Sequence, residues 1–400
     1  MSGGRGMRVL YHHRTASRDG QAVHIDEMIA ALREAGHEVM VVAPGGGDAP
    51  AGAQPGAMGS ASGFVDTLKR ALPQALYELL EFGYSLVAYG KLMRAARQFQ
   101  PDIIYERYNL FLLAGVMAAK RLNKPLLLEV NAPLFEERLK HSGGLSLVRL
   151  ARWAEGHVWR RASAVLPVTQ VLAGHVTARG VPAERIVVVP NGINEAHFDT
   201  APSPEQAKQQ LGLSGRLVLG FTGFVRDWHG VDRVIDWMAQ SDAPANTQLL
   251  VVGDGPVRAE LEAQAQRLGL AERVRFTGVV HRDQVPAYVA AFDVALQPAV
   301  TAYASPLKLM EYLVMGKAVV APDTPNIREI LQHDQNALLF TDGTPGALQA
   351  ALARVCQDTP LRQRLAVEAR ATIGRLGLTW RANAERAVAL GTRLAAARAR

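Results

Sequence analysis

The residues best suited to chemistry in this sequence lie in the segment 303–322, YASPLKLMEYLVMGKAVVAP. Ser305 is a favoured helix N-cap and Pro306 suits the first position of a helix, so the segment predicts a loop, a helix of about three turns and a buried parallel strand. Lys308 would fall in the first helical turn, where the positive end of the helix dipole disfavours a cation. An anion bound at that helix end would remove the conflict.

An anion at this helix end would also meet backbone donors. The N–H groups of Leu307, Lys308 and Leu309 would lack an acceptor within the first turn and would point at the anion. Glu311, one turn further on, would repel a phosphate but could accept hydrogen bonds from ribose hydroxyls beside it. We therefore interpret the segment as a site for a nucleoside diphosphate. The alternative is an ordinary core helix with a surface lysine and a solvated glutamate.

Further candidates follow other predicted strands of the C-terminal half. Arg226 and His229 lie in TGFVRDWHG, a loop between a predicted strand and a helix, where a Rossmann-type half binds phosphates. Arg226 and Lys308 together would balance the charge of a diphosphate, although a surface loop is the alternative for Arg226. Val280 follows the predicted strand 274–276 at the same sheet edge, and its loop could stack beside the nucleobase.

The candidates of the N-terminal half are Gly20, Arg107 and Asn131. Gly20 stands at the entrance of a predicted βαβ helix, where a backbone without Cβ would let a phosphate or sugar approach closely. A plain tight turn is the alternative for Gly20. Arg107 and Asn131 follow the predicted strands 102–105 and 125–130. Because ligands bind at the carboxyl ends of strands in open α/β sheets, we expect both side chains to face the substrate.

Length and composition predict a globular protein of two domains. The chain has 400 residues, more than one hydrophobic core usually carries, with 48% hydrophobic and 20% charged residues. The single cysteine, Cys356, excludes an internal disulfide. No run approaches the ~18 apolar residues of a membrane span, and the start has no apolar core of signal-peptide length, so a cytoplasmic protein is expected.

The net charge of +7 favours anionic partners. No nucleic-acid-binding module and no zinc-ligand spacing is found in the sequence. We therefore expect no nucleic acid, no metal ion and no cofactor, and an anionic small molecule or an acidic membrane surface as the partner.

The hydrophobic pattern predicts two successive α/β series, the second beginning at Arg216. The first series closes with a strand predicted at 185–189. Within it, residues 44–63 are rich in glycine, alanine and proline and predict a mobile loop, which two helices follow at 65–81 and 84–98.

Residues 138–161 carry six basic residues against one acid, Glu155, with leucines and tryptophans interleaved. An amphipathic helix of this composition can lie on an anionic bilayer, which would suit a lipid-linked acceptor. The alternative is a core helix with a solvated basic face.

Three motifs of the sequence are specific when they occur together. PNGIN stands at 190–194, GDGP at 253–256, and Ser-Pro-x-Lys-x-x-Glu-Tyr at 305–312, before the apolar run 318–321. With these motifs the chain resembles the retaining GT-B glycosyltransferases of family 4, over nearly its whole length.

The sequence also departs from the pattern of that family. The first of two donor-site glutamates falls on Tyr303, and Asn131 stands where a histidine is common. His229 takes the place of a lysine, and Arg226 is offset from the usual arginine. Asp19 replaces one glycine of the opening loop, whereas the glycine that follows it is kept.

The resemblance implies an α/β protein with the GT-B fold, built from two Rossmann-like doubly wound domains that face a central cleft. Residues 1–195 would form the acceptor-side domain, residues 196–378 the donor domain, and residues 379–400 a helix that packs back on the first domain. The implied reaction transfers a sugar from a nucleotide-diphosphate sugar to a hydroxyl acceptor with retention of configuration, without a metal ion. Polysaccharide or glycolipid assembly at the inner face of the plasma membrane is a further expectation.

The resemblance and the residues together give the expected site. Its catalytic residues would be Arg226, Lys308 and Glu311. The donor would be bound by Gly20, His229, Gly253, Asp254, Val280, Ser305, Pro306, Leu307 and Leu309. Arg107 and Asn131 would line the acceptor side.

Two other functions remain open at this point. A GT-B nucleotide-sugar 2-epimerase would need acid–base carboxylates and histidines that the sequence does not place. A catalytically degenerate nucleotide-sugar-binding subunit would explain the replacements at Tyr303 and Asn131. An NAD-dependent oxidoreductase is disfavoured, because no predicted strand is followed by G-x-G-x-x-G and a downstream ribose-binding acid.

Overall fold

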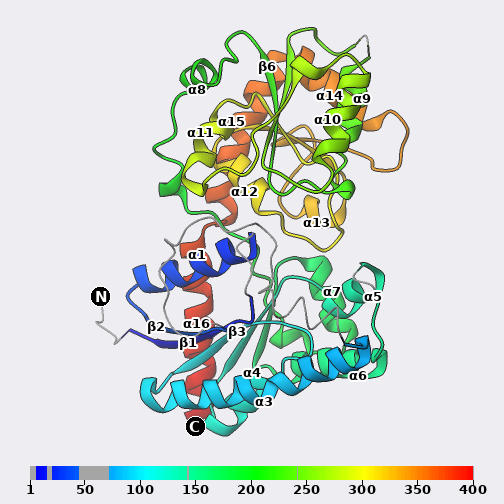
Figure 1. Cartoon of the computed structure of the whole chain (residues 1–400). Helices are drawn as coiled ribbons and strands as arrows, with labels where there is room; N and C mark the ends of the chain where they lie inside the picture. Colours follow the sequence, from blue (N-terminus) through cyan, green and yellow to red (C-terminus); the bar gives the residue numbers. More distant parts are fainter. Residues whose placement is uncertain (1–5, 16–19, 45–71, 142–143, 241, 400) are drawn as a thin grey trace. The chain divides into compact units, whose positions relative to one another are not determined.

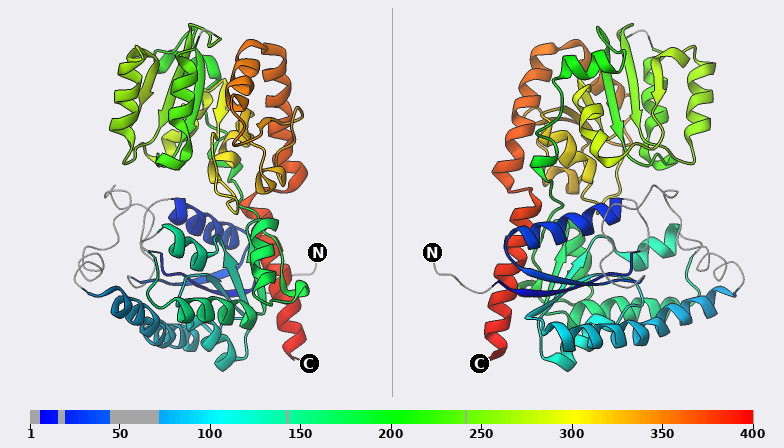
Figure 2. Two further views of the ribbon diagram at one scale, coloured as in Figure 1. Left: turned by 90° about the vertical axis from the view of Figure 1, so that its right-hand side faces the viewer. Right: turned by 60° about the vertical axis from the view of Figure 1, so that its left-hand side comes forward.

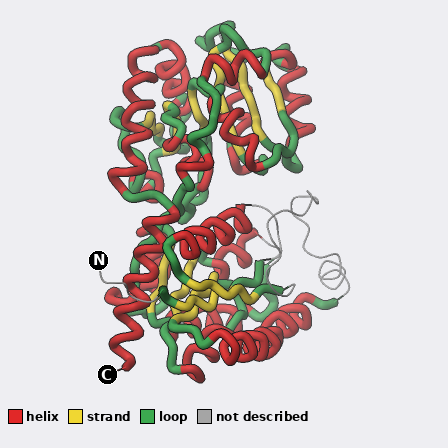
Figure 3. The backbone as a smooth tube through the Cα atoms, turned by 90° about the vertical axis from the view of Figure 1, so that its left-hand side faces the viewer, coloured by secondary structure: helices red, strands yellow, loops and turns green. Residues whose placement is uncertain are grey.

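The computed structural model describes residues 6–15, 20–44, 72–141, 144–240 and 242–399. The chain divides into two compact units, each an α/β unit of its own (Figure 1). Unit 1 comprises Met1–Pro190 and Trp380–Arg400, and unit 2 comprises Asn191–Thr379. In both units helices cover the two faces of a parallel sheet (Figure 3).

Unit 1 is built on a five-stranded parallel sheet in the order β2-β1-β3-β4-β5. Its strands are β1 (Arg8–His12), β2 (Glu38–Val42), β3 (Ile103–Arg107), β4 (Leu126–Val130) and β5 (Ala164–Pro167). Its helices are α1 (Gly20–Glu34), α3 (Gln74–Phe99), α4 (Ala114–Leu122), α5 (Leu134–His141), α6 (Val148–Arg161), α7 (Gln170–Ala178) and α16 (Trp380–Ala399).

The last helix, α16, belongs to unit 1 although 189 residues of unit 2 precede it in the chain. It packs along α1, and the Trp380 ring meets the His24 ring edge-on at 4.6 Å. Gly391 lets the helix approach the sheet, because a Cβ at that position would lie 3.0 Å from the Ile103 side chain.

Unit 2 is built on a six-stranded parallel sheet in the order β11-β10-β9-β6-β7-β8. Its strands are β6 (Leu217–Thr222), β7 (Thr247–Val252), β8 (Val274–Phe276), β9 (Val294–Leu296), β10 (Ala318–Pro322) and β11 (Ala337–Phe340). Its α-helices are α8 (Pro204–Gln210), α9 (Val231–Met238), α10 (Arg258–Arg267), α11 (Val285–Ala290), α12 (Leu307–Val314), α13 (Pro325–Arg328), α14 (Ala347–Gln357) and α15 (Thr359–Leu376).

The strand order of unit 2 reverses between β6 and β9. The chain runs outward from β6 to β7 and β8, then returns to the other side of β6 and continues through β9, β10 and β11. The carboxyl ends of β6 and β9 therefore lead to loops that diverge, and such a switch point is where open α/β sheets bind ligands. Apolar clusters fill both faces of this sheet and make it a rigid support.

Most predicted elements are present, but three predictions were wrong. Residues 74–99 form one continuous helix, α3, where two were expected, because Gly83 does not interrupt it. The expected strand at 185–189 is a short 3₁₀ turn and an extended segment that pairs with β5 by isolated hydrogen bonds. The basic stretch 138–161 divides into the end of α5 and α6. The predicted mobile loop at 44–63 lies almost entirely outside the described residues.

No helix of the described residues is both long enough and apolar enough to cross a membrane.

Candidate active site

The candidate site of unit 2 lies at the switch point, where β6 ends at Thr222 and the loop after β9 leads into α12. The sequence-predicted residues Lys308, Glu311 and His229 come together here, around the side chains of Phe221 and Thr222.

Lys308 is a half-buried cation in the first turn of α12. Its ammonium lies 3.8 Å from the centre of the Phe221 ring, and a Cβ on Gly223 would lie 3.6 Å from it. Within the described part of the chain, Lys308 pairs with no carboxylate. Burial lowers the pKa of Lys308 to about 7, and the charge of Glu311 offsets this only in part. The cation–π contact compensates little of that desolvation, so an anion bound beside Lys308 would stabilise its charge.

Glu311 is held at the carboxyl end of β6. The Thr222 hydroxyl donates to Oε2 of Glu311 at 3.1 Å, and the Thr222 N–H donates to the Tyr312 hydroxyl at 2.9 Å. Burial raises the pKa of Glu311, while the hydrogen bond from Thr222 and the charge of Lys308 act in the opposite direction. This arrangement leaves carboxylate lone pairs available to accept hydrogen bonds one turn away from Lys308.

The start of α12 differs from the prediction. The helix begins at Leu307, Pro306 occupies the N-cap position, and no side chain caps the helix. The hydroxyl of Ser305 instead accepts the N–H of Asn191 at 3.2 Å, and the Asn191 side chain donates to the Ser305 carbonyl at 2.6 Å. The prediction that Ser305 caps the helix was therefore wrong, because a tertiary partner from PNGIN takes its hydroxyl.

The backbone donors of this helix end are partly engaged. The Leu309 N–H donates to the Pro306 carbonyl at 3.2 Å, and the Leu309 side chain is buried in the core. The N–H groups of Leu307 and Lys308, in the first turn, have no acceptor within the helix and remain the donors suited to an anion.

His229 is a neutral hydrogen-bond donor of the site. Its Nδ1 accepts the N–H of Arg226 at 3.0 Å, so the proton of the neutral ring is on Nε2. Burial, and then the charges of Lys308 and Arg226, lower the pKa of His229 to about 3. The ring lies 5.3 Å from that of Phe221, which Lys308 also contacts.

Arg226 lies on the exposed rim of the site, and its charge acts on His229 together with that of Lys308. The side chain is exposed, and its guanidinium stacks on the rings of Phe224 at 4.7 Å and Trp228 at 5.0 Å. The stacking places the cation of Arg226 on the loop after β6, where solvent reaches it.

Gly253 and Asp254 support the loop after β6, and Val280 lies in the loop after β8. The N–H of Gly253 donates to the Thr277 hydroxyl at 3.2 Å, and a Cβ there would lie 2.1 Å from the Gly223 carbonyl oxygen. Asp254 accepts the N–H of the next residue at 2.8 Å. Val280 packs on the apolar core.

In unit 1 the predicted residues Arg107 and Asn131 meet at Glu129, a buried carboxylate of β4. Both donate to Oε1 of Glu129 at 2.6 Å, while His24 and the Tyr105 hydroxyl lie 2.9 Å from its Oε2. Burial alone would raise the pKa of Glu129, but His24 and Arg107 and the hydrogen bonds lower it overall. Arg107 and Asn131 are thus held by Glu129, whose central position the sequence pattern did not reveal.

The sequence analysis also missed a pair at the switch point of unit 1, between β1 and β3. His12 Nδ1 lies 2.5 Å from Oε2 of Glu106, and both side chains are buried. Gly115 leaves room for this carboxylate, because a Cβ there would lie 2.2 Å from it. A glutamate and a histidine at the ends of neighbouring strands are the signal that could have found the pair. Gly20 is the first residue of α1, after residues that the structure does not describe.

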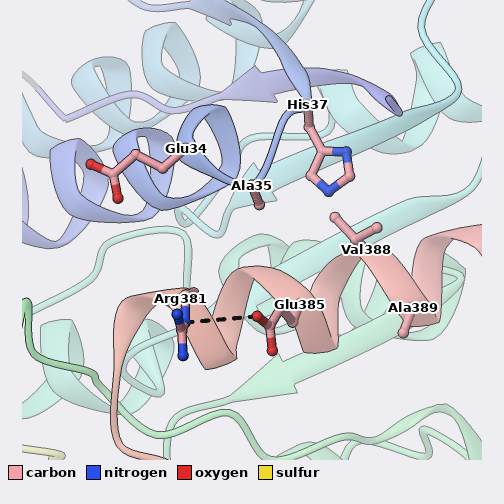
Figure 4. A pocket seen from close by; sticks show the side chains of 7 residues that line it. All are labelled: Glu34, Ala35, His37, Arg381, Glu385, Val388 and Ala389. Atoms are coloured by element: carbon pink, nitrogen blue, oxygen red, sulfur yellow. Dashed lines mark ion pairs between the residues drawn. The ribbon is translucent and has the colours of Figure 1, made fainter. Parts of the chain in front are cut away.

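Unit 1 has two hollows, of which only the second adjoins these groups. A shallow pocket of about 390 Å³ lies between the end of α1 and α16 (Figure 4). An enclosed cavity of about 10 Å³, room for about one water molecule, adjoins Glu129, His24 and Trp380. Among the described residues, no three side chains of the metal-binding types gather in one place.

Comparison with known proteins identifies the family. A family model described as Glycosyltransferase Family 4 matches residues 18–197, and one described as Glycosyl transferases group 1 matches residues 203–372. The chain belongs to glycosyltransferase family 4. The predicted family and the predicted enzyme class, a glycosyltransferase, are confirmed.

Curated relatives of this family 4 glycosyltransferase are similar over different lengths. It is 29% identical to a 2-deoxystreptamine glucosyltransferase of Streptomyces kanamyceticus, over 62% of this chain and 65% of the relative. It is 26% identical to a GDP-mannose-dependent alpha-mannosyltransferase of Mycobacterium tuberculosis, over 90% of this chain and 89% of the relative. The chain thus spans a little under two thirds of the first relative.

A solved structure supports the fold of the family 4 glycosyltransferase. Anabaena Alr3699/HepE, in complex with UDP, matches with a TM-score of 0.71 and 22% identity, over 96% of this chain and all of that one. The predicted GT-B fold, with two parallel-sheet α/β domains, is confirmed.

Proposed function

We propose that the protein transfers a sugar from a nucleoside-diphosphate sugar to a hydroxyl acceptor with retention of configuration, and that unit 2 binds the donor. The observation that carries the proposal is Lys308, a half-buried cation without a carboxylate partner at the start of α12, at the switch point of the sheet. A diphosphate supplies the anion that this position lacks.

In this proposal each side chain of the site has a separate task. Lys308 and the free N–H groups of α12 stabilise the negative charge that develops on the departing diphosphate. The neutral ring of His229 donates a hydrogen bond from its Nε2–H to a phosphate oxygen. Arg226 adds a positive charge from the rim of the site. Glu311 accepts hydrogen bonds from the ribose hydroxyls.

The reaction breaks the bond between the anomeric carbon and the diphosphate oxygen. The acceptor oxygen forms the new bond from the same face of the sugar, and its proton passes to a phosphate oxygen of the leaving diphosphate. The site therefore has to bind and polarise the donor, and it needs no protein nucleophile for this route.

The nucleobase and the sugar of the donor are left for experiment. The similar Anabaena structure holds UDP, whereas the mycobacterial relative is named for GDP-mannose. Both bases therefore belong in any test, together with adenine. Gly253 and Asp254 contribute by supporting the loop that faces the donor, and the loop of Val280 lies beside the nucleobase.

A lipid-linked acceptor and a peripheral position at the inner membrane face stay part of the proposal. Within 138–161, α6 buries Val158 and Trp159, so a membrane contact of this segment would use its exposed residues, among them Trp153. The acceptor side of the proposal places Arg107 and Asn131 in unit 1, where Glu129 orients both.

The proposal is tested by incubating the full chain with UDP-, GDP- and ADP-sugars, with and without candidate hydroxyl acceptors. We expect one donor class to yield a product with the anomeric configuration of the donor, and Lys308→Gln to lose that activity. Lys120→Gln, an exposed lysine of α4, is the matched control and should retain it.

Two outcomes would contradict the proposal. Epimerised sugar formed from the donor alone would favour a nucleotide-sugar 2-epimerase. Nucleotide binding without turnover of any donor in the panel would favour a catalytically degenerate binding subunit. The relatives, which are named as glycosyltransferases, favour transfer over both.

A further inference from the structure

The first four turns of α3 have an inverted polarity. The side chains of Glu78 and Ser85 are buried, and they bind the N–H groups of Ser146 and Leu147 and the backbone at Phe111. The opposite side of the same turns faces solvent. The polar groups of this half of the helix therefore point into unit 1, the reverse of an ordinary surface helix.

The solvent-facing side of these turns is apolar. After Gln74, the exposed first residue of the helix, the exposed residues are Leu76, Leu79, Leu80, Gly83, Leu86, Val87 and Gly90, which recur at helical spacing along about 21 Å of one face. We call these residues the α3 stripe. Leu79 is 50% exposed and Leu86 is 67% exposed. Contiguous exposed apolar surface of this kind marks an interaction site.

Exposed apolar side chains gather around the α3 stripe and nowhere else in the described part of unit 1. All eight large exposed apolar side chains of that part lie on α3, α5 and α6, five of them on the α3 stripe and the others being Leu139, Val148 and Trp153. Trp153 packs beside Phe82 of α3, with ring centres 6.3 Å apart. Helices α3 and α6 run along the outer edge of unit 1 (Figure 2).

The exposed charges around the α3 stripe are positive. They are Arg94 and Arg97 of α3, Lys140 of α5, and Arg149 and Arg152 of α6. The acids of α3 and α6 are turned inward or paired: Glu81 lies 2.8 Å from Arg138, and Glu155 is buried beside Arg179. The surface thus combines an apolar centre with a basic margin.

We propose that the α3 stripe and its basic margin bind the surface of an anionic lipid bilayer. Leucine and tryptophan side chains would enter the boundary between headgroups and acyl chains, while arginines remain at the level of the lipid phosphates. A second copy of this chain fits less well, because a symmetric contact would bring the arginine margins of both copies together.

The test is flotation of the full chain with vesicles of phosphatidylcholine containing about one third phosphatidylglycerol, against phosphatidylcholine alone. The wild-type chain should float with the anionic vesicles, and salt should reduce the binding. Leu79→Glu with Leu86→Glu should lower binding roughly tenfold or more, because both glutamates would have to enter the interface. Arg94→Gln with Arg149→Gln should weaken binding to the anionic vesicles but not to vesicles of phosphatidylcholine alone.

A matched control comes from unit 2. Val367 and Leu376 of α15 are 69% and 39% exposed, and Val367→Glu with Leu376→Glu should bind vesicles as the wild type does. Equal thermal unfolding of the two double variants would show that both remain folded.

A second measurement keeps the proposal testable if the α3 variant does not fold. Brominated lipid in anionic vesicles should quench Trp153, and the quenching should be lost in Trp153→Phe. Unchanged flotation of the α3 variant, or absence of quenching in the wild type, would overturn the proposal. It would equally be overturned if the α3 variant only converted a dimer into a monomer. These readings use no donor, so they stand apart from the proposed transferase activity.

Discussion

At the scale of single residues, two ionisable groups carry charges although their burial disfavours the charged form. Each lies at the carboxyl edge of a sheet. Lys308 of unit 2 lies over an aromatic ring without a carboxylate partner. Glu129 of unit 1 is buried but surrounded by His24, Arg107, Tyr105 and Asn131. The first group is completed by a ligand in our account, and the second is already satisfied by the protein.

The lowered pKa of Lys308 predicts how donor binding depends on pH. Protonated Lys308 attracts the diphosphate, and because its pKa in the free protein is about 7, affinity should fall as the pH rises above 7. The two phosphates of a nucleotide sugar each keep one negative charge over this range. Titration calorimetry of the active donor between pH 6 and 9 would measure the effect.

Two variants separate Lys308 from its neighbour. Lys308→Met should bind more weakly at pH 6 and should lose the pH dependence. His229→Gln should keep the dependence, since the pKa of His229, about 3, leaves that ring neutral throughout. A pH dependence that survives in Lys308→Met would assign the titration to another group.

The buried Glu129 predicts an acid sensitivity of unit 1. Its pKa in the folded state is lower than the ordinary value of 4.5, so it stabilises the fold above pH 4.5, and this contribution is lost as the pH falls further. Glu129→Gln should lower the free energy of unfolding by roughly 3 kcal/mol at pH 7, since it leaves the buried Arg107 cation without its partner. Thermal unfolding at pH 7 and pH 3.5 should show the gap to the wild type narrowing in acid; a constant gap would contradict this.

At the scale of elements, the start of α12 is fixed by contacts distant in the chain. Asn191 binds both the hydroxyl and the carbonyl of Ser305, 114 residues away. The loop after β6 is fixed similarly, because Gly253 and Gly255 let the loop after β7 pack against its carbonyl oxygens. Both contacts serve to hold Lys308 and His229 at the same edge of the sheet.

The close packing of these two loops gives an element-scale prediction. A Cβ on Gly255 would lie 1.9 Å from the Val225 carbonyl oxygen, so Gly255→Ala should displace the loop that carries His229 and weaken nucleotide binding roughly tenfold. Gly374→Ala in α15 is the control, because a Cβ there meets nothing within 4 Å. It should stabilise the protein by roughly 0.5–1 kcal/mol and leave nucleotide binding unchanged. Equal affinity of both variants would contradict the supporting role of Gly255.

The sequence predicted elements well where periodicity and local signals agree. The strands of both sheets and the α12 helix follow from buried apolar runs and from helical spacing. The role of Ser305 could not be predicted, since local propensity favours a cap and only the folded chain brings Asn191 to it. The break expected between residues 81 and 84 is absent, because Phe82 and Gly83 are themselves helical residues of α3.

The site of unit 1 was harder to predict than that of unit 2. Lys308 and Glu311 of α12 and His229 of the loop after β6 lie at one sheet edge, and motif and spacing point to them directly. Arg107 and Asn131 were found as polar residues after strands, but their shared partner Glu129 is revealed only by the register of β3 and β4, where Arg107 pairs with Glu129. The inverted polarity of α3 is likewise visible only once the buried side of the helix is known.

At the scale of the whole molecule, two α/β units of one design have their polar groups at the carboxyl edges of their sheets. Unit 2 has a cation without an ion-pair partner at its switch point, whereas unit 1 has buried carboxylates with close side-chain partners, Glu106 and Glu129. This difference in charge is why our account assigns the diphosphate to unit 2 and the neutral hydroxyl acceptor to unit 1.

Hydrogen exchange of the full chain, with and without the nucleoside diphosphate that it binds, tests this assignment most directly. We expect the nucleotide to slow hydrogen exchange in residues 222–230 and 303–311 of unit 2. Exchange in residues 106–113 of unit 1 should stay unchanged. Slower exchange confined to residues 106–113, or unchanged exchange at 303–311 under saturating nucleotide, would contradict it.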